Sequence, residues 1–264
     1  MLKVSLRSVR AFLPKLPIII FHEDYGQQQF DELRKIFEDI QFETVDFSGG
    51  QEHFIHRPKE GGNYEQQRTY LLMCRFFCGQ VQNHPAVQKY EYYMRLDDDS
   101  FFMEPRLDDF NRLLQYDYTY RSEYTDREHI TLCEFTQQFL GRHGFDSREL
   151  AQRGIDTRKA YSSRGIYNNF HISRLSMWQH PLIKAYLDDI EETHGILRGM
   201  WFDSRIQAII AWVLMPLVGL KSGIIVDFGY RHNRHRSQHN STGDPVYEDH
   251  LFFCPTKREV EYGY

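Results

Sequence analysis

The sequence predicts an α/β fold, in which a mostly parallel sheet is flanked by helices. Short runs rich in Ile, Val, Phe and Tyr alternate along the chain with longer segments of helical periodicity. This alternation is typical of strand–helix–strand units. The length of 264 residues, with 41% hydrophobic and 26% charged residues, is sufficient for a sizeable core. We therefore expect residues 1–264 to form a single domain.

Three strands and two helices are expected in the first part of the chain. Apolar and aromatic runs predict strands at residues 17–21 and 42–47. The segment 27–39 between them has Phe, Leu and Ile at helical spacing, which predicts an amphipathic helix. A second helix is expected near residues 64–83, and the aromatic run YYMRL at 92–96 predicts the next strand.

The remaining elements are predicted from the same patterns. Helices are expected at residues 107–116, 127–142 and 203–214, the last ended by Pro216, and strands at residues 166–172 and 224–226. The polar, Gly- and Arg-bearing segment 141–166 has no such pattern, so we expect a mobile loop over the site.

Composition excludes several classes of function. The formal net charge of −5 leaves no broad basic stripe for phosphates, so no nucleic-acid partner is expected. The longest apolar run near the start, residues 16–21, is too short to span a membrane, and no signal sequence is visible, so no membrane segment is expected. The 4 cysteines lack the spacing of a zinc site and leave the redox compartment open.

Three consecutive carboxylates, Asp97, Asp98 and Asp99, follow the strand predicted at residues 92–96. Alternate residues of a strand share a face, so Asp97 and Asp99 should converge and Asp98 should point away. Hard oxygen ligands suit Mg²⁺ or Mn²⁺ and the phosphates these ions carry. Asp-x-Asp at a strand end is the metal-binding signature of nucleotide-sugar glycosyltransferases. A solvated acidic turn is the alternative explanation.

Several segments together resemble the fungal α-1,2-mannosyltransferases of glycosyltransferase family 15. Residues 70–79 (YLLMCRFFCG), the turn His84-Pro85 and residues 89–96 (KYEYYMRL) are similar to the family's YxxMCRFYSG, His-Pro and KYDYYWRV segments. Further similar segments, in family order, are Phe21-His22-Glu23-Asp24, Tyr167-Asn168-Asn169-Phe170, Trp201-Phe202-Asp203 and Phe228-Gly229-Tyr230-Arg231-His232. The family's Glu-Pro-Asp is Asp97-Asp98-Asp99 here.

This resemblance implies a GT-A fold, a nucleotide-sugar donor such as GDP-mannose, a glycan or glycoprotein acceptor, and Mn²⁺ (or Mg²⁺). By position it implies metal ligation by Asp97, Asp99 and His232. The residues expected at the donor and its cofactor are Tyr70, Arg75, His22 and Asp97. Arg75 and Arg95 both match the family, and a structural ion pair would explain either of them as well as diphosphate binding does.

Two residues are candidates for the catalytic step. Asp203 matches a family aspartate and is expected to be the base or to bind the acceptor; capping a helix is the alternative. His171 stands where the family has a glutamate proposed to stabilise the sugar cation. A neutral imidazole cannot replace that carboxylate, so we hypothesise inversion at the anomeric carbon unless Glu134 or Asp227 has taken over. His171 would then contact sugar or acceptor hydroxyls, or be a structural histidine.

The function expected from these observations is metal-dependent transfer of a hexose, with mannose favoured, from a nucleotide sugar to a glycan hydroxyl. The alternative is a catalytically silent module of the same fold that binds carbohydrate or nucleotide sugar. Following the family would place the protein in the Golgi or secretory lumen. The sequence leaves the cytoplasm open as well, because no signal or anchor is visible.

Overall fold

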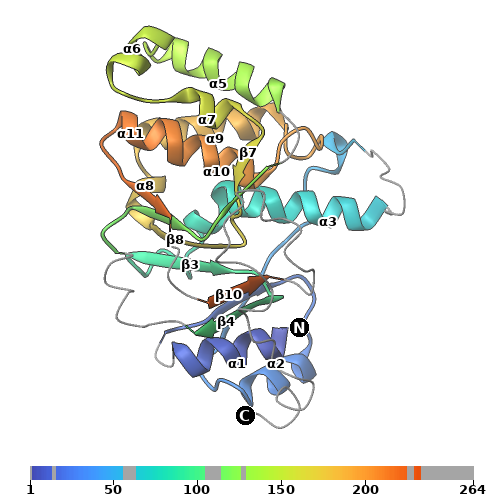
Figure 1. Cartoon of the computed structure of the whole chain (residues 1–264). Coiled ribbons are helices and arrows are strands. Elements are labelled where there is room, and N and C mark those ends of the chain that lie inside the picture. The colour runs from blue at the N-terminus through green and yellow to red at the C-terminus, as the bar shows by residue number, and fades with distance from the viewer. Residues whose placement is uncertain are drawn as a thin grey trace.

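A computed structural model describes residues 2–13, 16–55, 64–104, 114–125, 129–224 and 229–232 (Figure 1). Its helices are α1 (Leu2–Phe12), α2 (Gln27–Arg34), α3 (Tyr64–Arg75), α5 (Ile130–Arg142), α6 (Ser147–Gln152), α7 (Thr157–Tyr161), α8 (Leu175–Trp178), α9 (Pro181–Thr193), α10 (Asp203–Ile209) and α11 (Met215–Leu217). Its strands are β1 (Ile19–His22), β2 (Gln41–Thr44), β3 (Tyr92–Leu96), β4 (Ser100–Glu104), β5 (Tyr118–Tyr120), β6 (Glu123–Thr125), β7 (Arg164–Ile166), β8 (Phe170–Arg174), β9 (Ser222–Ile224) and β10 (Gly229–His232). Short 3₁₀ turns form η1 (Gln51–His53) and η3 (Val81–Asn83), and π-helical turns form η2 (Phe76–Gln80) and η5 (Ile210–Leu214).

The expected α/β class is confirmed, but the sheet is mixed rather than mostly parallel in the described part of the chain. The central sheet has the strand order β3-β8-β5-β9, and the pairs β1-β2, β10-β4 and β6-β7 stand beside it. Only β1–β2 and β5–β9 pair in parallel; the other described pairings are antiparallel. The predicted strand 166–172 is broken by a turn at Asn168 and Asn169, after which β8 runs antiparallel to β3.

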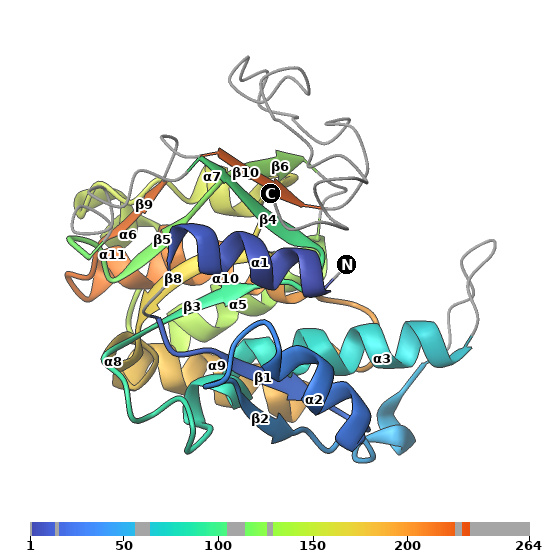
Figure 2. The ribbon, with the colours of Figure 1, turned by 90° about the horizontal axis from the view of Figure 1, so that it is seen from below.

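Two large apolar clusters lie on either side of the central sheet. One is formed mainly by α5, α9, α10 and η5, which lie above β3 and β8 in Figure 1. The other contains residues of α1, β1, β4, β8 and β10, and Figure 2 shows α1 lying along β4. In the continuous helical segment 203–215 every residue but Ser204 and Trp212 is buried, as expected of a helix that is apolar on all sides.

The structure corrects some sequence predictions. The segment 141–166 is not one mobile loop, because it contains α6, α7 and β7; Asp146 and Asp156 cap the two short helices through their side chains. Pro216 does not end the helix at 214, since helical backbone continues through η5 to Leu217. Residues 105–113, which carry most of the helix predicted at 107–116, lie outside the described residues. Helix α1 was not predicted.

The described residues include helices that could be tested for crossing a membrane and most of the cysteines. Among those residues, no helix has both the length and the apolarity required to cross a membrane. Cys74, Cys78 and Cys133 are buried free thiols; Cys254 is outside the described residues.

Candidate active site

The carboxylates of Asp97 and Asp99 follow the end of β3, where the chain turns into β4. The Asp97 N–H donates to the carbonyl of Asn169 (3.1 Å), and the Ser100 N–H donates to the carbonyl of Asp97 (3.0 Å). These bonds form a tight turn between the strand ends. The Asp97 and Asp99 side chains are each 24% exposed, whereas Asp98 is an exposed residue. The turn therefore leaves Asp98 exposed to solvent and its two neighbours, Asp97 and Asp99, partly buried.

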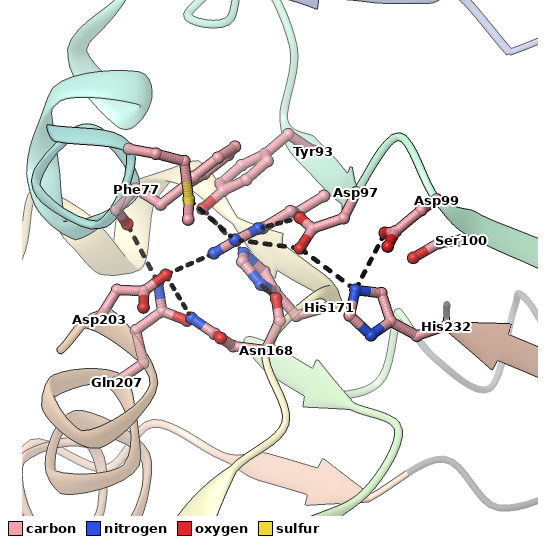
Figure 3. A network of polar contacts seen from close by, with 12 residues as sticks. Phe77, Tyr93, Asp97, Asp99, Ser100, Asn168, His171, Asp203, Gln207 and His232 are labelled. Atoms are coloured by element: carbon pink, nitrogen blue, oxygen red, sulfur yellow. Dashed lines mark hydrogen bonds and ion pairs between the residues drawn. The ribbon is translucent and has the colours of Figure 1, made fainter. Parts of the chain in front are cut away.

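His232 brings an imidazole to these carboxylates from β10. Antiparallel pairing of β10 with β4 places His232 opposite Ser100. Its Nε2 lies 3.0 Å from Oδ1 of Asp99 and 3.9 Å from Oδ2 of Asp97 (Figure 3). Its Nδ1 lies 2.8 Å from the hydroxyl of Tyr167. Two carboxylates and one imidazole thus lie near one another at the strand ends, at the positions where the acidic triplet and the family resemblance led us to expect a metal site.

The two carboxyl groups differ in electrostatic environment. The hydrogen bond from His232 lowers the pKa of Asp99. Burial raises the pKa of Asp97, although the Arg95 guanidinium acts in the opposite direction. In the described part of the chain, no three or more His, Cys, Asp or Glu side chains stand in a geometry ready to hold a metal ion. Both oxygens of Asp97 are in fact turned toward Arg95.

Arg95 lies at the centre of the site and is only 4% exposed. Its Nε donates to Oδ1 of Asp97 (2.9 Å), and its Nη1 donates to Oδ2 of Asp203 (2.7 Å). The guanidinium carbon is 3.7 Å from the ring centre of Phe77, a cation–π contact. Burial alone would lower the pKa of Arg95, but the two carboxylates raise it. The guanidinium therefore remains charged and links β3 to α10.

Asp203 begins α10 and is 3% exposed. The N-cap residue of this helix is Phe202, so capping by the Asp203 side chain does not explain its position. Besides Arg95, its Oδ2 accepts from the side-chain amide of Asn168 (2.9 Å). The same Asn168 amide donates to Gln207 (3.1 Å), whose own amide donates to the backbone carbonyl of Phe77 (3.0 Å). Asp203 is thus held in place by side-chain contacts and is linked to Asp97 through Arg95.

His171 lies inside the core and is 0% exposed. Its Nδ1 faces the carbonyl of Asn168 (3.2 Å), which can only accept, so Nδ1 carries the proton. Its Nε2 then accepts from the Tyr93 hydroxyl (3.0 Å), and the ring stacks on Tyr118. Burial lowers the pKa of His171 to about 3. This position fits the structural alternative, and contact with sugar or acceptor hydroxyls does not fit it.

The other expected donor residues lie at different places around this centre. Tyr70 is 50% exposed on α3, and its ring contacts Phe202, the neighbour of Asp203. The guanidinium of Arg75 pairs with Glu191 of α9 (Nε to Oε1, 2.7 Å), as in the ion-pair alternative. His22 ends β1 and accepts the N–H of Tyr25 at its Nδ1 (3.1 Å). Only Tyr70 of these three therefore adjoins the described network.

Neither acid suggested as a substitute for His171 can be placed in the site. Glu134 is exposed on α5, and Asp227 lies outside the described residues. Sequence reasoning also left Asn168, Gln207 and Tyr167 without roles. The similar segment at 167–170 marked two of them, whereas Gln207 gave no signal, because one polar residue in an apolar helix is not a motif.

Comparison with known proteins shows the family to which this chain belongs. The sequence profile of a family described as glycolipid 2-alpha-mannosyltransferase, glycosyltransferase family 15, matches residues 51–263. The chain belongs to this family. Among curated relatives, the O-glycoside alpha-1,2-mannosyltransferase omh1 of Schizosaccharomyces pombe is 26% identical over 154 residues, 55% of this chain. The glycolipid 2-alpha-mannosyltransferase of Saccharomyces cerevisiae is 23% identical over 205 residues, 75% of this chain.

The chain spans only part of these family 15 relatives, 40% and 42% of their respective lengths. Two solved structures share its fold. The mannosyltransferase Ktr4p of S. cerevisiae, in complex with GDP, has a TM-score of 0.69 and 19% identity and covers 88% of this chain and 67% of its own. Core-mannan synthase A of Aspergillus fumigatus, in an Mn/GDP form, has a TM-score of 0.66 and 20% identity, covering 98% and 78%. The expected GT-A fold is therefore confirmed.

Proposed function

We propose that this chain carries the donor site of a Mn²⁺-dependent mannosyltransferase, which moves mannose from GDP-mannose to a hydroxyl of a glycan or glycoprotein. The observation that carries the proposal is the convergence of Asp97, Asp99 and His232 at the strand ends of a family 15 chain. Homologous structures described with GDP, and one with Mn, support the choice of donor and metal.

The residues present fit a divalent metal in chemical type. Two carboxylates with one imidazole favour Mn²⁺ over Mg²⁺, because nitrogen ligands suit the softer ion. Asp97, Asp99 and His232 would hold it, and Tyr167 would orient the imidazole through its contact with Nδ1. The ion would neutralise the charge that develops on the departing diphosphate. His232 would face the ion through Nε2, the atom that lies 3.0 Å from Oδ1 of Asp99.

Asp203 is proposed to bind the acceptor hydroxyl. The hydrogen bonds that its carboxylate accepts from Arg95 and Asn168 both use Oδ2. Oδ1 takes part in neither contact, so it can accept a hydrogen bond from an incoming hydroxyl. The donors from Arg95 and Asn168 fix the direction of the carboxylate, which favours its use in orienting the acceptor hydroxyl.

The names of the matched relatives also bear on stereochemistry. They describe α-mannosyltransferases, and GDP-mannose is itself α-linked, so an α-linked product would mean retention. This argues against the inverting hypothesis drawn from His171. Because position 171 supplies a buried imidazole, we propose retention by same-face attack. The acceptor hydroxyl attacks as the diphosphate leaves, and its proton passes to a diphosphate oxygen.

Two measurements test the proposal. Thermal shifts with GDP-mannose, GDP and UDP-glucose, each with and without Mn²⁺, should show the largest stabilisation with the guanosine ligands and Mn²⁺. Release of GDP should then require a mannose-terminated acceptor, and NMR of the first-formed product should show an α-linkage. The alternative, a silent binding module, would show the shift without release. A β-linked product would restore inversion.

A further inference from the structure

Arg95 takes part in a closed circuit of contacts that joins the metal-site carboxylates to the acceptor-side carboxylate. From Arg95 the circuit passes to Asp203, then through the Asn168 amide to Gln207. The Gln207 amide donates to the carbonyl of Phe77, and the ring of Phe77 lies against the Arg95 guanidinium. Figure 3 shows Asp97 and Asp203 on opposite sides of the network that joins them.

The two carboxylates accept from different edges of one planar guanidinium. Asp97 receives Nε (2.9 Å) and Nη2 (3.5 Å), whereas Asp203 receives Nη1 (2.7 Å). The Arg95 and Asp203 side chains are 2% and 5% exposed, so water screens this contact poorly. One positive charge is thereby shared between two anionic groups that lie 106 positions apart in the sequence, at 97 and 203.

We propose that Arg95 is a positioning residue that couples the metal-binding carboxylate Asp97 to the acceptor-side carboxylate Asp203. The coupling rests on the proposed function and adds to it a link between the two half-sites. The negative charge of Asp203 offsets part of the positive charge of Arg95. The electrostatic potential at Asp97 is therefore more negative, which favours binding of a cation there. The planar fork also fixes the direction of both carboxylates.

This coupling makes a signed prediction for Asp203→Asn. Loss of the Asp203 charge leaves the whole guanidinium charge to Asp97, which competes with the metal. Mn²⁺ affinity should fall about 3- to 10-fold, although Asp203 is not itself a ligand. Arg95→Lys keeps the charge but loses the fork, so it should weaken Mn²⁺ binding about 10-fold. In the Arg95→Lys background a single ammonium cannot contact both carboxylates as the fork does, so adding Asp203→Asn should change Mn²⁺ affinity less than about twofold.

The experiment is a double-mutant cycle on the full chain in the presence of saturating GDP. Mn²⁺ affinity is measured by electron paramagnetic resonance of the free ion, and melting temperature is recorded for every variant. Arg174→Lys is the matched control, since Arg174 also bridges two carboxylates, Glu91 and Asp117, outside the site. The Arg174→Lys variant should bind Mn²⁺ with the same affinity as the wild type.

The outcomes separate this inference from the function on which it rests. A wild-type chain that binds no Mn²⁺ with GDP would overturn the proposed function and this coupling with it. Wild-type binding with equal Mn²⁺ affinity in Asp203→Asn would overturn the coupling alone. If Arg95→Lys fails to fold, Asp203→Asn decides by itself. If Arg95 is purely structural, Arg95→Lys should lower the melting temperature but leave Mn²⁺ affinity unchanged. Asp203→Asn should then change Mn²⁺ affinity equally in the wild type and in the Arg95→Lys background.

Discussion

The hydroxyl of Tyr167 lies 2.8 Å from Nδ1 of His232, on the side of the ring opposite Asp99. In the neutral imidazole with Nε2–H donating to Asp99, Nδ1 accepts from the Tyr167 hydroxyl. With Nε2 bound to a metal, Nδ1 must carry the proton and Tyr167 must accept it. A tyrosine hydroxyl can do both, so this contact holds the imidazole in place in either tautomer.

Tyr167→Phe removes that partner while keeping the ring. We expect Mn²⁺ affinity in the presence of GDP to fall about 10-fold, the usual effect of losing a hydrogen bond behind a metal-binding histidine. Isothermal titration with Mn²⁺ measures it. Tyr92→Phe, which loses a hydroxyl contact to the Leu114 carbonyl outside the site, is the control. Equal affinities in the wild type and Tyr167→Phe would show that His232 is not a ligand.

Substitution of the three acids tests the metal site directly. Asp97→Ala and Asp99→Ala should abolish Mn²⁺-dependent binding of GDP, whereas Asp98→Ala should have a milder effect because Asp98 is exposed. Asp97→Ala should also lower the melting temperature, since it leaves the buried Arg95 with one carboxylate fewer. Thermal shifts with and without Mn²⁺ report both effects. Equal loss of binding in all three variants would contradict the assignment.

Asp203→Asn tests the acceptor-side role by kinetics. Donor binding and fold should persist, while turnover with acceptor should fall about 10²-fold, because the acceptor hydroxyl loses the group that orients it. Release of GDP, followed as a function of acceptor concentration, separates kcat from KM. A lower melting temperature with unchanged turnover would instead make Asp203 a structural residue only.

His171 makes stability depend on pH. Its pKa is about 3 in the folded protein and ordinarily about 6.5, so the unfolded chain binds the extra proton first. Stability should therefore be lost as pH falls below about 6.5, by about 1.4 kcal/mol per pH unit. Between pH 7 and pH 5 the wild type should lose about 2 kcal/mol more than His171→Gln, measured by urea unfolding. Parallel losses in the two proteins would refute the buried neutral imidazole.

Sequence analysis predicted those parts of the fold that have strong local patterns. The strand at Tyr92–Leu96 and the helices beginning at Gln27 and Tyr64 were predicted because apolar residues recur over several turns or alternate clearly. The short helices α6 and α7 span too few residues to show a period, and their signals were the single capping residues Asp146 and Asp156. Pairing direction depends on the turn at Asn169, which no periodicity reveals.

In the site too, residues within one short segment could be predicted, whereas contacts between segments distant in sequence could not. Asp97 and Asp99 could be found because a strand end and an acidic triplet coincide in one segment. The interpretation of His171 was less successful, since its burial beneath Tyr118 depends on packing between β5 and β8. The link from Arg95 to Asp203 joins residues from a strand and a helix that are distant in sequence, so only the folded chain shows it.

The π-helical turn at Phe76–Gln80 determines how the chain tolerates changes in length. There the Val81 N–H bonds to the carbonyl of Phe76, one residue further back than in an α-helix. The Phe77 carbonyl is thereby freed, and it accepts the side-chain amides of Gln82 (3.1 Å) and Gln207 (3.0 Å). The backbone is kinked here, with non-helical angles at Cys78 and at Gly79 (φ +149°), and deleting Gly79 would displace the acceptor shared by both glutamines. A one-residue deletion in this helix should therefore damage catalysis more than it damages folding.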